Sequence, residues 1–238
     1  MKERIVASSE PVTLIGGGDA EVSQLSDALK IAPVCVAADG GAELARRANI
    51  PLRAIIGDMD SISADTLSQI PPDRQIKISE QETTDFDKAL RHIDAPLVIG
   101  VGFLGGRLDH QLAALHILAV QAHRPCILIA KTEILFIAPP TICVQAEPGD
   151  VISIFPLGPV TGRSRGLEWP IDGIAFDTLS KIGTSNRALG EVALEMSSPN
   201  AVIMMPRRLI QPVAQALVSS DAVGWPPRGR RYKAQLPL

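Results

Sequence analysis

Apolar, strand-like runs alternate with helix-like stretches up to about residue 138, and this alternation constrains the fold of the chain more than any other feature. The clearest strand-like runs lie at 12–15, 34–38, 54–57 and 97–102. Such alternation requires crossover connections, which favours an α/β fold with a mostly parallel, Rossmann-like sheet. Ligands bind to such sheets at the carboxyl ends of the strands. We therefore expect the functional site at that edge.

After Pro139 the pattern changes to short β-rich runs such as VISIF and AVIMM, separated by Gly, Pro and Asn. These runs predict a second, all-β domain. The segment RRLIQPVAQALVSS predicts a further helix, interrupted by Pro212, and the remaining residues are expected to be irregular. We thus expect an α/β domain at 1–138, a β domain at 139–206 and a helical or irregular extension at 207–238.

Composition narrows the classes of function. Hydrophobic residues make up 46% of the 238 residues, enough for a substantial core, and the net charge of −3 gives no basis for binding nucleic acid or an anionic membrane. No apolar run approaches the ~18 residues of a membrane span, so a cytoplasmic location is expected. Cys35, Cys126 and Cys143 have no paired spacing and are interpreted as buried thiols of a reducing compartment.

Five aspartates each stand where a strand-like run gives way to a turn or a helix start: Asp39, Asp58, Asp60, Asp85 and Asp109. The carboxylates of Asp58 and Asp60 can converge if the turn between them leaves extended geometry. Mg²⁺ favours such hard oxygen ligands, completed by water and substrate phosphates. The pattern therefore predicts a site for a metal-bound polyphosphate.

Basic residues accompany these aspartates. Lys88 follows Asp85 by three residues, so both can lie on one helical face, where the carboxylate would hold metal and the ammonium would neutralise phosphate. In the alternative interpretation Thr84 is the N-cap of that helix and Asp85 only complements the helix dipole. Asp87 is interpreted as a solvated residue.

Two glycine-rich segments follow strand-like runs. Gly16, Gly17 and Gly18 could form a backbone nest for phosphate, or could serve only as a steric turn, and they match neither a Walker A loop nor the dinucleotide fingerprint. After Gly105–Gly106, Arg107 could grip phosphate. In the same segment Asp109 could bind metal or cap a helix, and His110 could donate a hydrogen bond.

Four blocks in order closely resemble the thiamine pyrophosphokinase (thiamine diphosphokinase) family: Asp39-Gly-Gly-Ala, Gly57-Asp-Met-Asp-Ser61, Thr84-Asp-Phe-Asp-Lys88 and Gly105-Gly-Arg-Leu-Asp-His110. Gly183-Thr-Ser-Asn186, followed by Gly190, resembles the thiamine-binding half of the family. The resemblance covers roughly residues 11–206.

The resemblance implies ATP-dependent transfer of diphosphate to the hydroxyl of thiamine, giving thiamine diphosphate and AMP. It also implies an α/β nucleotide-binding domain followed by a β-sandwich, and a homodimer with thiamine bound where the subunits meet. The metal-site aspartates of the family map onto Asp58, Asp60 and Asp85, with Asp39 and Asp109 close by. Thiamine contacts map onto Ser185 and Asn186, and onto Trp169 in a segment that only approximates the family pattern.

The residue types suit this chemistry, because phosphoryl transfer depends on positioning and on neutralising negative charge. We assign Mg²⁺ to the three metal-site aspartates and charge stabilisation to Lys88 and Arg107. Either Asp39 or Asp109 could orient or deprotonate the attacking hydroxyl. The residues expected to bind ATP phosphates are Gly16, Gly17, Gly18, Gly40, Lys88, Arg107 and His110.

Two other classes of function remain open. Asp58-Met-Asp60 resembles the nucleophile motif of haloacid-dehalogenase-like phosphatases, although it follows two strand–helix units and Ile62 stands where Thr is usual. The third interpretation is a nucleotide or thiamine sensor without catalysis, because a binding fold need not catalyse.

Overall fold

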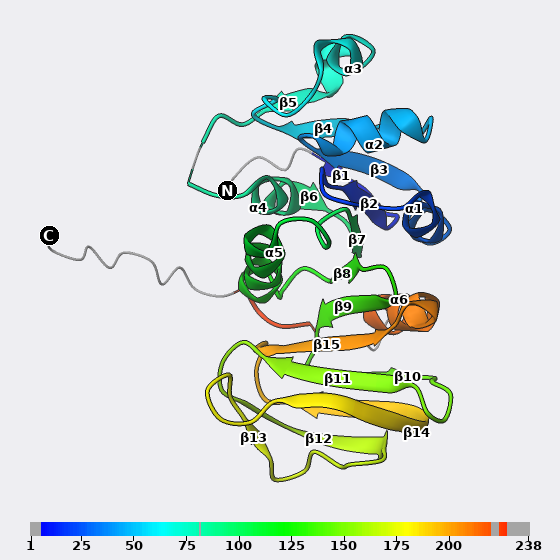
Figure 1. Ribbon diagram of the computed structural model, residues 1–238, viewed down its shortest axis with the longest axis vertical. Helices are drawn as coiled ribbons and strands as arrows, with labels where there is room; N and C mark the ends of the chain where they lie inside the picture. Colours follow the sequence, from blue (N-terminus) through cyan, green and yellow to red (C-terminus); the bar gives the residue numbers. More distant parts are fainter. Residues whose placement is uncertain (1–5, 81, 220–223, 228–238) are drawn as a thin grey trace, which may run out of the picture.

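The computed structural model describes residues 6–80, 82–219 and 224–227 (Figure 1). The first half alternates strands and helices, as its apolar pattern predicts. Its main elements are β1 (Val6–Ala7), β2 (Val12–Ile15), α1 (Val22–Leu29), β3 (Val34–Ala38), α2 (Gly41–Arg47), β4 (Ala54–Gly57), α3 (Ala64–Ser68), β5 (Gln75–Lys77), α4 (Asp85–Arg91), β6 (Ile93–Asp94), β7 (Val98–Val101), α5 (Leu108–Val120) and β8 (Cys126–Ile129). The short 3₁₀ helix η1 (Pro72–Arg74) precedes β5.

The second half is rich in strands, as expected. It contains β9 (Glu133–Ile137), β10 (Thr141–Val144), β11 (Val151–Pro156), β12 (Val160–Leu167), β13 (Ala175–Phe176), β14 (Gly183–Met196) and β15 (Ala201–Pro206). The long β14 pairs with β11 through its first residues and with β10 and β12 through its last.

One large mixed sheet runs through both halves. Strands β5, β4, β3, β2, β7 and β8 pair in parallel, and the sheet then continues through β9, β15, β11, β14, β12 and β13 with antiparallel pairs. The expectation of a mostly parallel sheet is therefore wrong for the sheet as a whole. The cause is the β8–β9 hairpin, which reverses the chain direction next to the last parallel strand and lets β15 pair antiparallel with β9. The β-sandwich stays a prediction.

Helices cover both faces of the parallel part of the sheet. Side chains of α1 and α2 pack into one apolar core, and those of α4 and α5 pack into a second core on the opposite face. All residues of β2, β4 and β7 are buried, as in parallel strands that are covered on both sides. Both cores continue into the second half, so each sheet face is shared between the two halves.

The chain after β15 joins the core instead of extending from it. The 3₁₀ helix η2 (Arg207–Leu209) leads into α6 (Ile210–Val218), which buries Ile210, Val213 and Leu217. Pro212 does not interrupt this helix, contrary to expectation. It lies in the first turn, where the missing N–H has no helical acceptor to lose.

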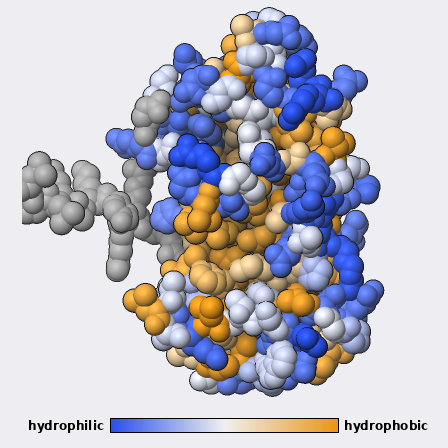
Figure 2. Space-filling model, viewed as in Figure 1, coloured by the Kyte–Doolittle hydropathy of each residue, from blue (hydrophilic) through white to orange (hydrophobic). Residues whose placement is uncertain are grey.

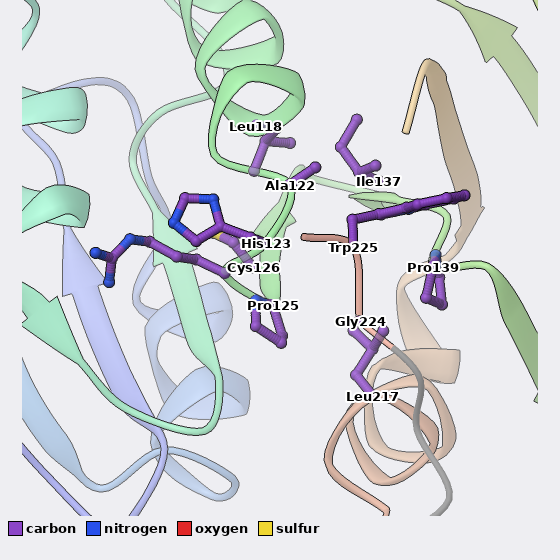
Figure 3. A pocket seen from close by; sticks show the side chains of 11 residues that line it. Leu118, Ala122, His123, Pro125, Cys126, Ile137, Pro139, Leu217, Gly224 and Trp225 are labelled. Carbon is purple, nitrogen blue, oxygen red and sulfur yellow. The ribbon is translucent and has the colours of Figure 1, made fainter. Parts of the chain in front are cut away.

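Trp225 packs against both apolar cores, and its indole Nε1 donates a hydrogen bond to the Ala138 carbonyl (2.7 Å). Figure 3 shows the small cavity beside it, about 100 Å³ in volume, with Leu118, Pro139 and Leu217 in its lining. The expected irregular end of the extension, at 228–238, lies outside the described residues.

Two surface properties follow from the fold. Cys35 and Cys126 are buried as expected, but Cys143 is exposed, because alternate residues of β10 face outward.

Apolar side chains gather across the middle of one face, between the two halves (Figure 2). Within the described ranges, no helix combines the length and the apolar character needed to cross a membrane.

Candidate active site

A cavity of about 630 Å³ lies at the carboxyl ends of β2, β3, β4 and β7, the edge where the strand pattern places the site. It gathers nearly all the candidate residues of the first half: Gly16, Gly17, Gly18, Asp39, Gly40, Asp58, Asp60, Asp85, Lys88, Arg107 and His110. Sequence reasoning missed several lining residues: Asp19, Ser61, Thr83, Phe86 and Phe103. Of these, Asp19, Ser61, Thr83 and Phe86 lie within or directly beside a motif that the sequence analysis names, and Phe103 does not. Asp109 is not among the lining residues that the structure describes.

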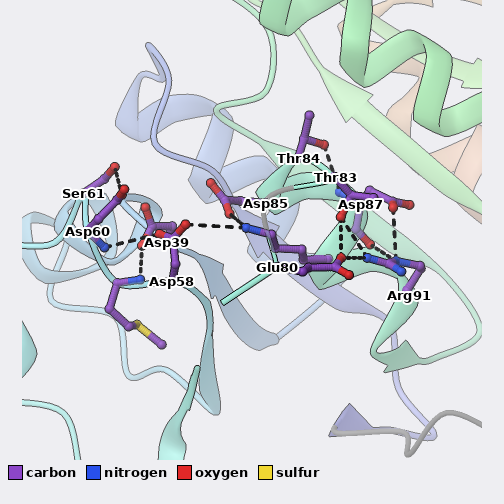
Figure 4. Close-up of polar contacts among 12 residues, drawn as sticks. Asp39, Asp58, Asp60, Ser61, Glu80, Thr83, Thr84, Asp85, Asp87 and Arg91 are labelled. Atoms are coloured by element: carbon purple, nitrogen blue, oxygen red, sulfur yellow. Dashed lines mark hydrogen bonds and ion pairs between the residues drawn. The ribbon is translucent and has the colours of Figure 1, made fainter. Parts of the chain in front are cut away.

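A carboxylate cluster occupies one side of the cavity. Asp39, Asp58 and Asp60 each offer an oxygen, and these oxygens all lie within 4.8 Å of one another. Met59 has a φ of 70°, so the turn leaves extended geometry and brings its two acidic neighbours together. The Met59 N–H donates to Asp39 Oδ1 (3.0 Å), which ties the end of β3 to the end of β4 (Figure 4).

Asp39 is the most buried member of this cluster. Burial raises the pKa of the Asp39 carboxyl, and the charges of Asp85, Asp58 and Asp60 raise it further, against the hydroxyl of Ser61, which lowers it. Crowded carboxylates of this kind repel one another, and a divalent cation would relieve the repulsion. The donor set, all carboxylate oxygen, is the chemistry that Mg²⁺ prefers, so the residues present fit that ion.

Lys88 links the carboxylate cluster to α4. Its side chain is only 2% exposed, and its ammonium nitrogen lies 3.1 Å from Asp85 Oδ1 and 3.6 Å from Asp58 Oδ2. Burial by itself disfavours the charged form, but Asp85 and Asp58 outweigh it, so the pKa of Lys88 is raised. Asp85 and Lys88 therefore share one helical face, and the lysine is a fixed positive charge in the cavity wall.

The capping interpretation of the same segment also holds. Thr84 accepts a hydrogen bond from the Asp87 N–H (3.2 Å) and is the N-cap of α4. The interpretation of Asp87 as solvated is wrong, because its carboxylate is buried against Arg91 (3.1 Å) and Gln121 (3.0 Å). The two acidic residues of α4 thus have different surroundings.

The three consecutive glycines do not form the predicted nest. The N–H groups of Gly16 and Gly18 already donate to the carbonyls of Val101 (2.7 Å) and Gly102 (2.9 Å). The following helix begins only at Val22. These glycines instead allow close packing at the cavity wall, since a Cβ on Gly16 would lie 2.7 Å from the Phe103 ring.

Arg107 and Asp109 form an exposed ion pair at the rim, with Nη2 and Oδ2 2.6 Å apart. The hydrogen bond between them raises the pKa of Arg107 and lowers that of Asp109. Asp109 therefore lies apart from the carboxylate cluster and is bound to Arg107, while Asp39 is a member of that cluster.

The residues matched to the thiamine-binding half lie outside this cavity. Asn186 is buried, and its side-chain amide is occupied by the main chain of Trp169: Oδ1 accepts from the Trp169 N–H (3.1 Å), and Nδ2 donates to the Trp169 carbonyl (2.6 Å). Trp169 itself is 54% exposed. Ser185 has a φ of 63°, and its N–H donates to Ser153 Oγ (3.0 Å).

A clustered set of carboxylates and a buried lysine, at the carboxyl edge of parallel strands, define an α/β protein suited to binding metal-bound phosphates. Residues 25–129 match the family model described as thiamin pyrophosphokinase, catalytic domain. The matching sequence relatives and solved structures are likewise described as thiamin pyrophosphokinases, so the chain is similar to that family. The resemblance inferred from the four blocks is confirmed.

Among sequence relatives, Thiamine pyrophosphokinase 2 of Oryza sativa subsp. japonica is 30% identical over 164 residues, covering 60% of this chain and 61% of the relative. Thiamine pyrophosphokinase 1 of Arabidopsis thaliana is 27% identical over 156 residues, covering 56% of this chain and 57% of the relative. The matches thus span about three-fifths of the length of these relatives.

Solved structures share the fold. The thiamin pyrophosphokinase of Candida albicans has a TM-score of 0.70 and 18% identity, covering 82% of this chain and 89% of its own. That of Geobacillus thermodenitrificans has a TM-score of 0.68 and 23% identity, covering 82% of this chain and 96% of its own.

Proposed function

We propose that this protein transfers the diphosphate group of ATP to the hydroxyl of thiamine, giving thiamine diphosphate and AMP. The observation that carries the proposal is the convergence of four separate sequence blocks on one cavity. These blocks supply the carboxylate cluster, the buried Lys88 and the rim residue Arg107. Much of this cavity lies within the stretch that matches the catalytic-domain model.

In this proposal Asp58, Asp60 and Asp85 hold Mg²⁺, and the position of Asp39 adds it to the candidate ligands. Bound Mg²⁺ would neutralise phosphate charge and orient the phosphates for in-line attack. Lys88 and Arg107 stabilise the remaining negative charge, and His110 donates a hydrogen bond to phosphate. Gly17 and Gly40 let the phosphates approach the wall closely, since neither carries a side chain.

The attacking hydroxyl requires a group that orients it or accepts its proton. Of the two candidates, Asp39 lines the cavity, whereas Asp109 is bound to Arg107 at the rim. We therefore favour Asp39 for this role.

Thiamine would bind between two subunits, with Trp169 and Ser185 of one protomer near the phosphate cavity of the other. This explains why these residues lie outside the cavity of their own chain. The exposed Leu108 and Leu112 beside Arg107 support a contact between copies. We accordingly propose a homodimer located in the cytoplasm, with a β-sandwich as the thiamine-binding unit and domains at 1–138, 139–206 and 207–238. Sedimentation velocity measures the assembly state, and a monomer at all concentrations would contradict the proposed homodimer.

The deciding experiment combines purified protein, ATP, Mg²⁺ and thiamine, and measures AMP. We expect AMP to form only when thiamine is present. A phosphatase of the haloacid-dehalogenase type would instead trap phosphate on Asp58 without thiamine. A sensor would bind ATP or thiamine and release no AMP.

Replacing Asp58 by Asn should lower kcat by about a hundredfold or more, because charge neutralisation at the phosphates is worth several kcal/mol. The melting temperature should change little, since the side chain keeps its shape. Asp73→Asn, in η1 and exposed, is the matched control and should keep full activity. Full activity of Asp58→Asn would contradict the metal assignment.

A further inference from the structure

Arg91 lies at the last turn of α4 and is not among the described residues that line the cavity. Its side chain is 19% exposed, and its guanidinium contacts several groups at once. It donates to the carboxylate of Glu80 and to Thr83 Oγ1 (2.9 Å), and it pairs with Asp87 Oδ2 (3.1 Å). Thr83 Oγ1 in turn donates to Glu80 Oε1 (2.6 Å), so these side chains form one network (Figure 4).

The network connects three parts of the chain. Glu80 and Thr83 belong to the segment that precedes α4, and Asp87 and Arg91 belong to α4 itself. Gln121, at the end of α5, donates from Nε2 to Asp87 Oδ1 (3.0 Å). A planar guanidinium is suited to such a junction, because its donors point in fixed directions toward several acceptors.

Different residues of α4 therefore contact the cavity and the network. Asp85 and Lys88 line the cavity, where Lys88 pairs with both Asp85 and Asp58, whereas Asp87 and Arg91 belong to the network. The helix has only seven residues, too few to be stable by its own hydrogen bonds. Its rotation must be fixed by contacts outside the helix. Phe86, Ala89 and Leu90 pack into the second apolar core, and Arg91 adds polar contacts to Glu80 and Thr83, which precede the helix.

We propose that Arg91 is a positioning residue for the active site. Through Glu80, Thr83 and Asp87 it fixes the segment before α4 and the rotation of the helix, so that Asp85 and Lys88 face the carboxylate cluster. The inference rests on the proposed function of that cavity. Its consequence is that removing the guanidinium misplaces groups that hold metal and phosphate, although Arg91 touches neither.

The test uses the full chain with Arg91→Met, which keeps most of the side-chain length and removes the charge, and Arg91→Lys. For Arg91→Met we expect the Mg²⁺ concentration for half-maximal AMP formation to rise about tenfold, as for residues that orient metal ligands. We expect kcat to fall about ten- to hundredfold, because small misplacements of reacting groups are costly. Arg91→Lys should restore part of both losses, since one ammonium cannot meet all three partners.

Arg207→Met is the matched control. Arg207 is also largely buried and pairs with Asp27 (2.7 Å), but it joins η2 to α1 and is not a lining residue of the cavity. Removing this guanidinium should lower the melting temperature and leave the Mg²⁺ requirement and kcat at wild-type values. Equal Mg²⁺ requirements and kcat for Arg91→Met and wild type would overturn the proposal, as would equal losses in Arg207→Met.

A second readout separates this inference from the proposed function. Binding of Mn²⁺ in the presence of ATP, followed by electron paramagnetic resonance, needs no turnover, and it should weaken about tenfold in Arg91→Met. If the wild type binds Mn²⁺ with ATP but forms no AMP, the proposed function fails while this measurement still decides the role of Arg91. If Arg91→Met does not fold, Glu80→Gln removes one partner of the network and should weaken Mn²⁺ binding in the same direction. Unchanged binding in that variant would reject the proposal.

Discussion

The Glu43 carboxylate, on α2, holds the start of α3 through three hydrogen bonds. It accepts from the N–H (3.0 Å) and hydroxyl (2.6 Å) of Ser63 and from the hydroxyl of Thr66 (2.8 Å). Hydrogen bonds to the charged form, those from Ser63 first, lower the pKa of Glu43 to about 2. A single side chain thus connects two helices of the first half.

Because the pKa of Glu43 is lower in the folded state, its stabilising effect is complete above pH 4.5, its ordinary pKa, and is lost as the pH falls toward 2. Glu43→Gln should therefore lower the free energy of unfolding by about 1 kcal/mol at pH 7, allowing for partial exposure. The difference from wild type should shrink below pH 4.5 and vanish near pH 2. Urea unfolding across this range measures it, with exposed Glu133→Gln as control. A difference that does not depend on pH would show that the charge is not responsible.

Asn186 acts in a similar way on the segment that carries Trp169. Asn186→Ala should remove the hydrogen bonds to the Trp169 main chain and lower the free energy of unfolding by about 2 kcal/mol. In a Trp225→Phe background, the fluorescence of Trp169 should become less anisotropic and more accessible to acrylamide. Ser185→Ala is the neighbouring control, since the hydrogen bond from Ser185 to Ser153 Oγ uses its main-chain N–H, which alanine keeps. Unchanged fluorescence would leave Asn186 without a positioning effect on Trp169.

At the level of elements, the packing of α2 on β2 depends on the absence of a side chain at Gly41. A Cβ at this position would lie 1.9 Å from the Ile15 carbonyl oxygen, which is main chain and cannot move aside alone. The helix therefore approaches the strand end closely, and this approach places Asp39 and Gly40 at the cavity edge.

Gly41→Ala should force α2 away from β2 and lower the free energy of unfolding by about 3 kcal/mol, in the range of overpacked cores. Gly158→Ala is the control, because its Cβ would meet the flexible side chain of Asn200 at 3.3 Å. Thermal unfolding compares the two variants. Equally small losses of unfolding free energy in Gly41→Ala and Gly158→Ala would indicate that α2 can move away from β2 without loss of stability.

At the scale of the whole molecule, Trp225 ties the last described segment to both apolar cores near Ala138, where the two halves of the chain meet. Trp225→Ala should cost about 3 kcal/mol of unfolding free energy, as for large core truncations. Trp225→Phe should cost about 1 kcal/mol, for the hydrogen bond to Ala138. Chemical denaturation measures both, and the exposed Trp169→Ala is the control. Equal losses of unfolding free energy in Trp225→Ala and Trp169→Ala would contradict the stabilising role of Trp225.

Prediction from sequence worked where the signal was local. The strands at 12–15, 34–38 and 54–57 have the predicted bounds, and most motif residues reach the same cavity. The buried state of Asp87 was missed, since it depends on Gln121, which is distant in sequence. The exposure of Cys143 was missed because its local run was taken as wholly buried, whereas alternate residues of β10 face outward. The pairing of β9 with β15 joins residues about 70 positions apart, and no local pattern indicates such a partner.

The sequence alone determined the order of strands and helices, the positions of the acidic blocks and the family they resemble, because these are properties of short segments. The tertiary structure decided that Asp39 joins Asp58 and Asp60 while Asp109 does not, and that one sheet passes through both halves. It also decided that Arg91, unremarkable in the sequence, holds α4 in place. These outcomes depend on contacts between distant segments, which form only when crossovers and strand pairing bring those segments together.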